Sequence, residues 1–147
     1  MIDIVVQNAA GSSQMPGEED FRLWVKTALA DCTGDAAVTI RLVGEPEGRE
    51  LNLRYRKKDY ATNVLSFPAE IPEMLDLPDL GDIVMCVPVV VREAAEQEKN
   101  EKDHWAHLVI HAILHLRGFD HEEPEQAQEM ESIEIDFLNR LEISNPY

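Results

Sequence analysis

The chain has little of what would place it among secreted or membrane proteins. Its two cysteines, Cys32 and Cys86, are too few for a disulfide framework, and we expect both thiols to stay reduced. The longest apolar runs, residues 83–91 and 108–116, are far shorter than the roughly 20 residues that cross a bilayer. Asp3 stands where a secretory signal would be positively charged. We therefore expect a cytoplasmic protein without a membrane span.

Basic residues are also scarce. The 13 Lys and Arg stand against 29 Asp and Glu, which gives a net charge of −16. This deficit argues against nucleic-acid binding through overall charge, because neutralising phosphates draws on Lys and Arg. Local charge can differ from overall charge, however, and the densest basic cluster comprises Arg54, Arg56, Lys57 and Lys58. A positive patch on an acidic body therefore remains compatible with the sequence.

The fractions of hydrophobic and charged residues are typical of a folded protein. Hydrophobic residues make up 44% of the chain and charged residues 29%, and the 147 residues suit one domain, residues 1–147. Hydrophobic periodicity predicts strands at residues 2–6, 38–43, 62–67 and 83–87. It predicts helices at residues 18–30, 47–58, 89–99, 102–116 and 125–141. Residues 69–80, which contain prolines among acids, are predicted to form a surface loop. The sequence thus predicts a mixed α/β domain.

Three histidines near the end of one predicted helix form the strongest chemical signal. His111 and His115 are four residues apart and lie on the same helix face, about one turn from each other, so one metal ion can bridge them. Gly118 can end the helix in a left-handed conformation that turns His121 back toward the same ion. Three protein ligands with an open fourth position are typical of catalytic zinc, whereas structural zinc is usually closed by four. We therefore predict a catalytic zinc site at His111, His115 and His121.

A protease is the first alternative. The spacing of the histidines and the glycine matches the metal-binding element of metzincin proteases. The position after the first histidine is Ala112, however, and a methyl group cannot replace the glutamate that acts as general base in those enzymes. Glu122 or Glu123 could substitute, although nothing in the sequence orients either carboxylate. A metzincin-like metallohydrolase is thus the weaker interpretation.

A second alternative is a non-enzymatic protein whose zinc is structural. Such a site needs a fourth protein ligand, and Cys86 is the one thiol in the second half of the chain. The remaining histidines, His104 and His107, precede the motif, and we expect them to occupy solvated or packed helix positions.

The run from His111 to His121, HAILHLRGFDH, closely resembles the HGxLHLxGYDH motif of the bacterial YbeY endoribonucleases, also described as rRNA maturation factors. Ala112 and Phe119 are the two departures, and neither is a ligand. Residues 51–68 are similar to the LNxxYRxxDxxTxVLSFP segment of this family, and residues 80–83 match its LGDI element. The resemblance covers most of residues 51–121.

This resemblance implies an α/β fold with a small, mostly parallel sheet of about four strands, covered by helices and carrying the three-histidine site. It implies a zinc-dependent endoribonuclease that is specific for single strands and acts in small-subunit rRNA 3′-end maturation and ribosome quality control. The implied partners are single-stranded rRNA, the ribosomal small subunit and its assembly factors. The non-enzymatic alternative is then a ribosome-assembly factor with structural zinc. Arg56 corresponds to the functionally important arginine of the family, and His111, His115 and His121 correspond to its zinc ligands.

The chemistry of Arg56 fits this role, because a guanidinium can donate two parallel hydrogen bonds to a phosphate that gathers charge. A helix-end cation stabilised by the helix dipole is the alternative. Asp120 either accepts a hydrogen bond from a ligand imidazole or caps the turn after Gly118. Asn63 and Ser66 either line the site or bond the backbone of a turn.

Overall fold

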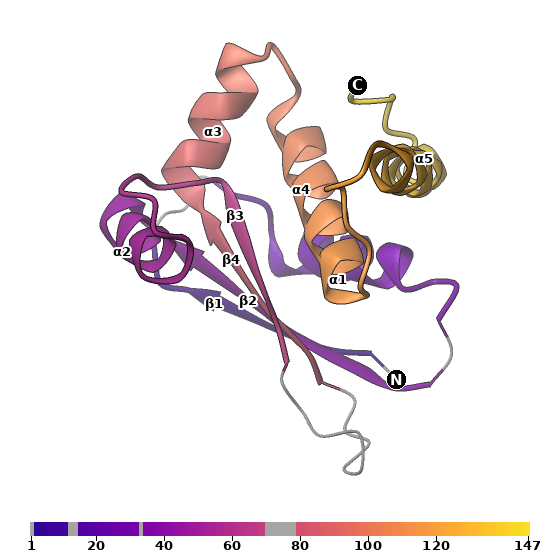
Figure 1. The fold of residues 1–147 in the computed structure, drawn as a ribbon, viewed down its shortest axis with the longest axis horizontal. Coiled ribbons are helices and arrows are strands. Elements are labelled where there is room, and N and C mark those ends of the chain that lie inside the picture. The colour runs from indigo at the N-terminus through magenta and orange to yellow at the C-terminus, as the bar shows by residue number, and fades with distance from the viewer. Residues whose placement is uncertain (1, 12–14, 33, 70–78) are drawn as a thin grey trace.

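Strands and helices alternate as far as the third strand, and three helices follow the fourth strand. The computed structural model describes residues 2–11, 15–32, 34–69 and 79–147. The elements, shown in Figure 1, are β1 (Ile2–Asn8), α1 (Glu18–Ala28), β2 (Ala36–Val43), α2 (Glu45–Arg56), β3 (Val64–Pro68), β4 (Asp79–Cys86), α3 (Val87–Glu96), α4 (Glu101–Leu116) and α5 (Pro124–Arg140).

The strands form one sheet in the order β1-β2-β4-β3. β1, β2 and β4 run parallel, whereas β3 pairs antiparallel with β4 at the edge, where Ser66 lies opposite Ile83. Parallel neighbours need long crossover connections, which α1 supplies between β1 and β2. The small, mostly parallel sheet that the family resemblance implies is therefore confirmed, with one antiparallel edge strand.

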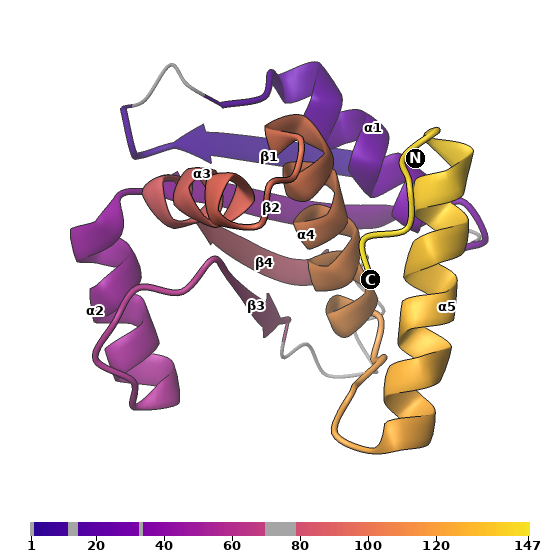
Figure 2. The ribbon, with the colours of Figure 1, turned by 90° about the horizontal axis from the view of Figure 1, so that it is seen from above.

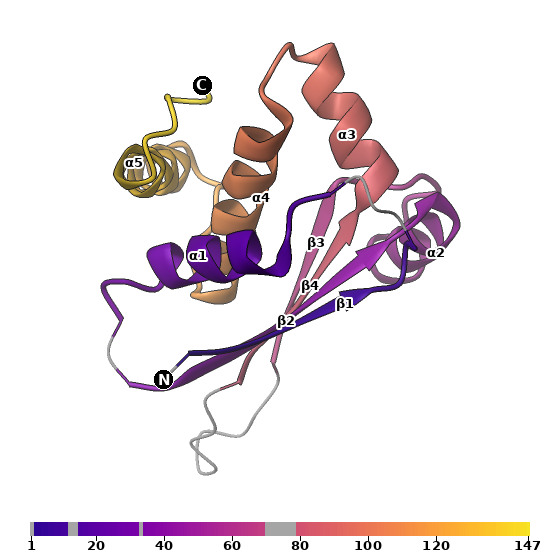
Figure 3. The ribbon, with the colours of Figure 1, turned by 180° about the vertical axis from the view of Figure 1, so that it is seen from behind.

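Helices cover one face of the sheet and part of the other. Figures 1 and 3 show α1, α4 and α5 on one side of it, and Figure 2 shows α4 at the centre of this layer. The larger core lies here, where Ile40 and Ile83 of the sheet belong to the same buried cluster as Trp105 and Ile110 of α4. Successive residues of a strand point to opposite faces, so Val84 belongs to a second, smaller core beneath α2. Elsewhere this second face is open to solvent, where Val5 and Asp82 are exposed, so the outer strand β1 alternates between buried and exposed residues.

Helix α4 carries the site, and its own sequence explains where it begins. The side chain of Asn100 caps it by accepting a hydrogen bond from the backbone N–H of Asp103 at 3.1 Å. The helix is buried along most of its length and contacts both α1 and β3. The large buried surface of α4 holds its carboxyl end, with His111 and His115, in a fixed place next to the edge strand.

Most predicted elements agree with the structure to within two or three residues, but β4 begins four residues earlier than predicted. Asp79 and Leu80, predicted as loop, belong to β4, while residues 70–78 of that loop lie outside the described residues. Helix α2 begins at Glu45 and ends at Arg56, because Pro46 suits a first turn and Lys57 takes a left-handed conformation with φ 63°. Within the described ranges, no helix is long and apolar enough to cross a membrane.

Candidate metal centre

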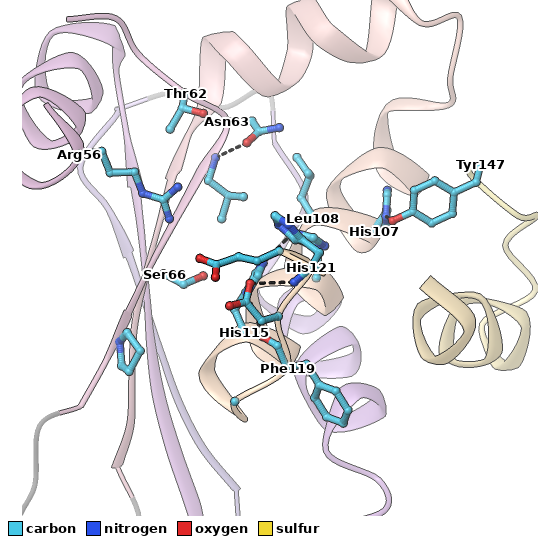
Figure 4. A pocket seen from close by; sticks show the side chains of 16 residues that line it. Arg56, Thr62, Asn63, Ser66, His107, Leu108, His115, Phe119, His121 and Tyr147 are labelled. Carbon is cyan, nitrogen blue, oxygen red and sulfur yellow. Dashed lines mark hydrogen bonds between the residues drawn. The ribbon is translucent and has the colours of Figure 1, made fainter. Parts of the chain in front are cut away.

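The three predicted histidines meet at the carboxyl end of α4. The Nε2 atoms of His111 and His115 are 3.1 Å apart, and Gly118, with φ 99°, reverses the chain after the helix. The backbone N–H of Phe119 donates to the carbonyl of Leu114 at 3.0 Å and closes this reversal. One nitrogen from each of His111, His115 and His121 lies within 4.8 Å of the others. Figure 4 shows His115 and His121 close to each other. The local turn that the sequence predicted is therefore present, and it gathers the three rings.

The hydrogen bonds of these rings show that the cluster suits a cation. Nδ1 of His115 lies 3.1 Å from the carbonyl oxygen of Phe119, and Nδ1 of His111 contacts the carboxylate of Glu134. Both partners are acceptors, so in a neutral ring the hydrogen is on Nδ1 and the lone pair is on Nε2. Two lone pairs that face each other at 3.1 Å repel unless a cation lies near both. The donor set therefore fits a metal ion held through Nε2 of His111 and His115.

The charge state of His115 suits a ligand as well. Burial lowers the pKa of His115, and the neighbouring rings of His111 and His121 lower it further. A lowered pKa keeps the imidazole neutral near pH 7, and a metal ion binds the neutral form.

Glu134 is a site residue that the sequence reasoning missed. It lies on α5 with 0% of its surface exposed and accepts hydrogen bonds from His111, His107 and the hydroxyl of Tyr147. Burial alone raises the pKa of this carboxyl, but the three hydrogen bonds outweigh burial and lower the pKa to about 2. An ionised carboxylate thus orients His111 from behind, as carboxylates commonly do for metal-binding histidines.

The sequence did contain a signal for Glu134. The buried residues of α5 follow a helical period along one face, namely Met130, Glu134, Phe137 and Leu138. An acid at one of these core positions is unusual, because a buried charge is costly unless hydrogen bonds compensate it. The pattern marks Glu134 as an acid with a partner, although it does not identify His111 as that partner.

The histidine cluster opens onto a cavity of about 690 Å³. One wall comes from α4 and the turn after it, and the other comes from β3 and the segment before it. Figure 4 shows Arg56 reaching toward the cavity from the end of α2, with Ser66 on the strand and Thr62 and Asn63 above it. The structure thus brings Arg56, the predicted catalytic residue, to the same cavity as the three histidines, although the two segments are far apart in the sequence.

The structure distinguishes between roles that the sequence left open. Asp120 accepts a hydrogen bond from the backbone N–H of His121 at 2.7 Å, so it stabilises the turn. Asn63 lines the cavity, but its side chain bonds the N–H of Val64 at 2.6 Å and Glu93 at 2.9 Å. Asn63 therefore helps to hold the start of β3. Ser66 lines the cavity.

The two upstream histidines behave differently. His104 is buried and its Nε2 lies 2.9 Å from Glu93, which agrees with the expected packed position. His107 is packed too, yet it also lines the cavity and its Nε2 lies 3.2 Å from Glu134 and 3.1 Å from the hydroxyl of Tyr147. His107 thus belongs to the surroundings of the site, and its position four residues before His111 on the same helix face was the signal that the sequence reasoning missed.

Neither alternative interpretation gains support from the site. Cys86 is buried in the smaller core against Gly48, and among the described residues the metal-binding group consists of the three histidines. Ala112, where a metzincin carries its glutamate, is 0% exposed and belongs to the main core. Glu122 does line the cavity. The site thus lacks both a fourth cysteine ligand and an acid at the position of the protease base.

The fold and the site together define an α/β protein with a three-histidine, catalytic-type arrangement on a helix beside the edge of the sheet. The family model described as Endoribonuclease YbeY matches residues 6–142 of the chain. Proteins named Endoribonuclease YbeY are 54% identical in Pseudomonas putida, 53% in Pseudomonas fluorescens and 55% in Stutzerimonas stutzeri, each over 148 aligned residues. These alignments cover 100% of this chain and 94%, 97% and 92% of the three relatives, respectively. The chain therefore belongs to the YbeY endoribonuclease family.

A solved structure shares this fold. The solution structure of a protein from Thermotoga maritima superposes with a TM-score of 0.61 at 29% sequence identity. The match covers 99% of this chain and 98% of that one, so the similarity extends over the whole fold.

Proposed function

We propose that this protein is a zinc-dependent endoribonuclease that cleaves single-stranded RNA and acts in small-subunit rRNA 3′-end maturation and ribosome quality control. Membership of the family and the names of the relatives support the reaction class. The structural observation that carries the proposal is the cavity that joins three convergent imidazoles to an arginine on another element. The family resemblance supports the ribosomal small subunit and its assembly factors as partners.

His111, His115 and His121 would hold the metal, and imidazole nitrogens suit zinc. When bound in such a site, zinc supplies a Lewis acid and makes a water-derived nucleophile available at neutral pH. Glu134 and the carbonyl of Phe119 keep Nε2 of His111 and of His115 free of hydrogen, so both rings are ready to act as ligands.

Arg56 would recognise the phosphate. Its side chain lines the cavity, and within the described part of the chain it has no acidic partner that would occupy its donors. A guanidinium can donate two parallel N–H bonds to the non-bridging oxygens of a phosphodiester and stabilise the charge that develops there. Arg56 also ends α2, where the helix dipole favours a cation, so its structural and functional roles are compatible.

The test compares one RNA sequence as a single strand and as a duplex. We expect zinc-loaded protein to cut the single strand internally, and we expect His115→Ala and chelator-treated protein to leave it intact. Absence of cleavage with zinc and with other divalent metals would exclude the nuclease function for this chain. Equal cleavage of the duplex would retain the nuclease and remove the single-strand specificity.

A further inference from the structure

An aromatic pair with one exposed ring lies beside the cavity. Tyr55, in the last turn of α2, contacts Phe67 of β3 edge to face, with ring centroids 5.0 Å apart and planes at 67°. Phe67 is partly buried against the smaller core, which fixes its position, whereas Tyr55 is 57% exposed. A large aromatic ring that is supported from behind and open to solvent is suited to contact another planar group.

The pair is next to the proposed catalytic groups along two separate elements. On α2, Tyr55 immediately precedes Arg56, which lines the cavity. On β3, Phe67 lies between Ser66 and Pro68, which both line the cavity. Side chains alternate along a strand, so Phe67 lies on the opposite face of β3 from these two. Because β3 is an edge strand of the described sheet, a chain that leaves the cavity past Arg56 can bend around this edge and meet Tyr55.

The charge around Tyr55 indicates which kind of molecule this surface binds. Six arginines lie outside residues 54–58, and each of them is paired with an acidic side chain. They are Arg22, Arg41, Arg49, Arg92, Arg117 and Arg140. Arg54 and Arg56, on either side of Tyr55, have no such partner in the described ranges, and Lys57 and Lys58 follow them. In a chain with a net charge of −16, this segment keeps its positive charge available for a polyanion.

Proteins that bind single-stranded nucleic acid combine cationic side chains with exposed aromatic rings. The cations attract the phosphates, and the ring stacks on a base. We propose that Tyr55, supported by Phe67, is a base-stacking subsite that holds a nucleotide next to the one whose phosphate meets Arg56. The subsite accepts any base, because every base has a π face. This inference rests on the proposed function, since it assigns a further contact to the same RNA.

The test measures binding separately from cleavage. Fluorescence anisotropy of a short, labelled 2′-O-methyl oligoribonucleotide gives the Kd of the zinc-loaded protein, and electrophoresis confirms that the oligonucleotide stays intact. We expect Tyr55→Ala to raise the Kd about 5- to 150-fold, which corresponds to the loss of one stacked base. Tyr55→Phe should stay within about twofold of the unmodified protein because it keeps the ring. Thermal unfolding should show that all variants remain folded.

Two controls isolate stacking from general surface effects. Tyr60 is 54% exposed, nearly as much as Tyr55, and lies outside the cavity, so Tyr60→Ala should leave the Kd within about twofold. An oligonucleotide that is abasic throughout should bind more weakly to the unmodified protein, and Tyr55→Ala should cause no further loss with it.

The outcomes separate this inference from the proposed function. If the unmodified protein binds and cleaves RNA but Tyr55→Ala binds it equally well, the subsite is wrong and the nuclease stands. If Tyr55→Ala keeps RNA affinity but loses association with purified small ribosomal subunits, the aromatic pair contacts protein and the stacking role is overturned. If the unmodified protein neither binds nor cleaves RNA, the proposed function and the subsite fail together.

Discussion

Glu134 on α5 accepts a hydrogen bond from Nδ1 of His111 on α4, and this contact leaves Nε2 of His111 without hydrogen and 3.1 Å from Nε2 of His115. The carboxylate is fully buried, and its pKa is lowered to about 2 because hydrogen bonds from His107, His111 and Tyr147 outweigh the effect of burial. Burial, followed by the neighbouring Glu134, raises the pKa of Tyr147, so the hydroxyl remains a donor. The orientation of one proposed ligand therefore depends on a second helix.

The first prediction concerns metal content. Purified protein should hold about one zinc ion per chain, and His115→Ala should lose most of it, because two ligands hold the ion far more weakly than three. Elemental analysis after dialysis measures both. Arg56→Ala, which changes the opposite wall of the cavity, should retain the metal. Unchanged zinc content in the Ala variants of all three histidines would remove the metal site.

The second prediction concerns Glu134. Glu134→Gln keeps the size of the side chain but removes the charge that orients His111, and we expect zinc affinity to fall roughly 10- to 100-fold. Competition with a zinc-binding dye measures this affinity. Glu131→Gln, an exposed change one turn away on the same helix, is the matched control and should leave it unaltered. Equal affinities for both variants would contradict an orienting role for Glu134.

The third prediction concerns Arg56. Arg56→Ala should leave folding and zinc content intact while reducing RNA cleavage by about 10²-fold or more, as expected for the loss of one preorganised donor. Arg56→Lys should recover part of the rate, since an ammonium keeps the charge but lacks the planar fork. Single-turnover cleavage at saturating protein is the measurement.

Matched controls for Arg56 come from its own cluster. The Ala variants of Arg54, Lys57 and Lys58 should weaken RNA binding modestly and flatten its salt dependence, with little change in the single-turnover rate. A rate for Arg56→Ala equal to that of the unmodified protein would make Arg56 a helix-end cation only.

The fourth prediction concerns the protease alternative. Ala112→Glu restores the protease-like motif, but Ala112 is 0% exposed in the main core, so the new carboxylate would be buried without partners. We expect destabilisation of about 3 kcal/mol or more and no robust cleavage of casein. Ala95→Glu, an exposed site on α3, should leave the unfolding temperature nearly unchanged. Vigorous casein cleavage by the unmodified protein would instead support the protease.

Much of the metal centre follows from the sequence because its geometry is local. The four-residue spacing of His111 and His115 places them on one helix face, and Gly118 can adopt the conformation that turns His121 back. Each of these relationships spans one or two helical turns, so backbone geometry alone determines it. The alternation of strands and helices was predictable for the same reason, since periodicity is a property of neighbouring residues.

Only the tertiary structure decided which distant residues share the cavity. Glu134 meets His111 because α5 packs beside α4, and Tyr55 meets Phe67 because α2 ends beside the edge strand. The antiparallel direction of β3 also depends on its pairing with β4. Sequence spacing does not encode such contacts, because they depend on how the buried surfaces of the whole chain fit together. The sequence by itself determined the three proposed ligands and the turn that gathers them, and its resemblance to the family indicated Arg56. Packing decided that Glu134 orients His111 and brought Arg56 to the same cavity as the histidines.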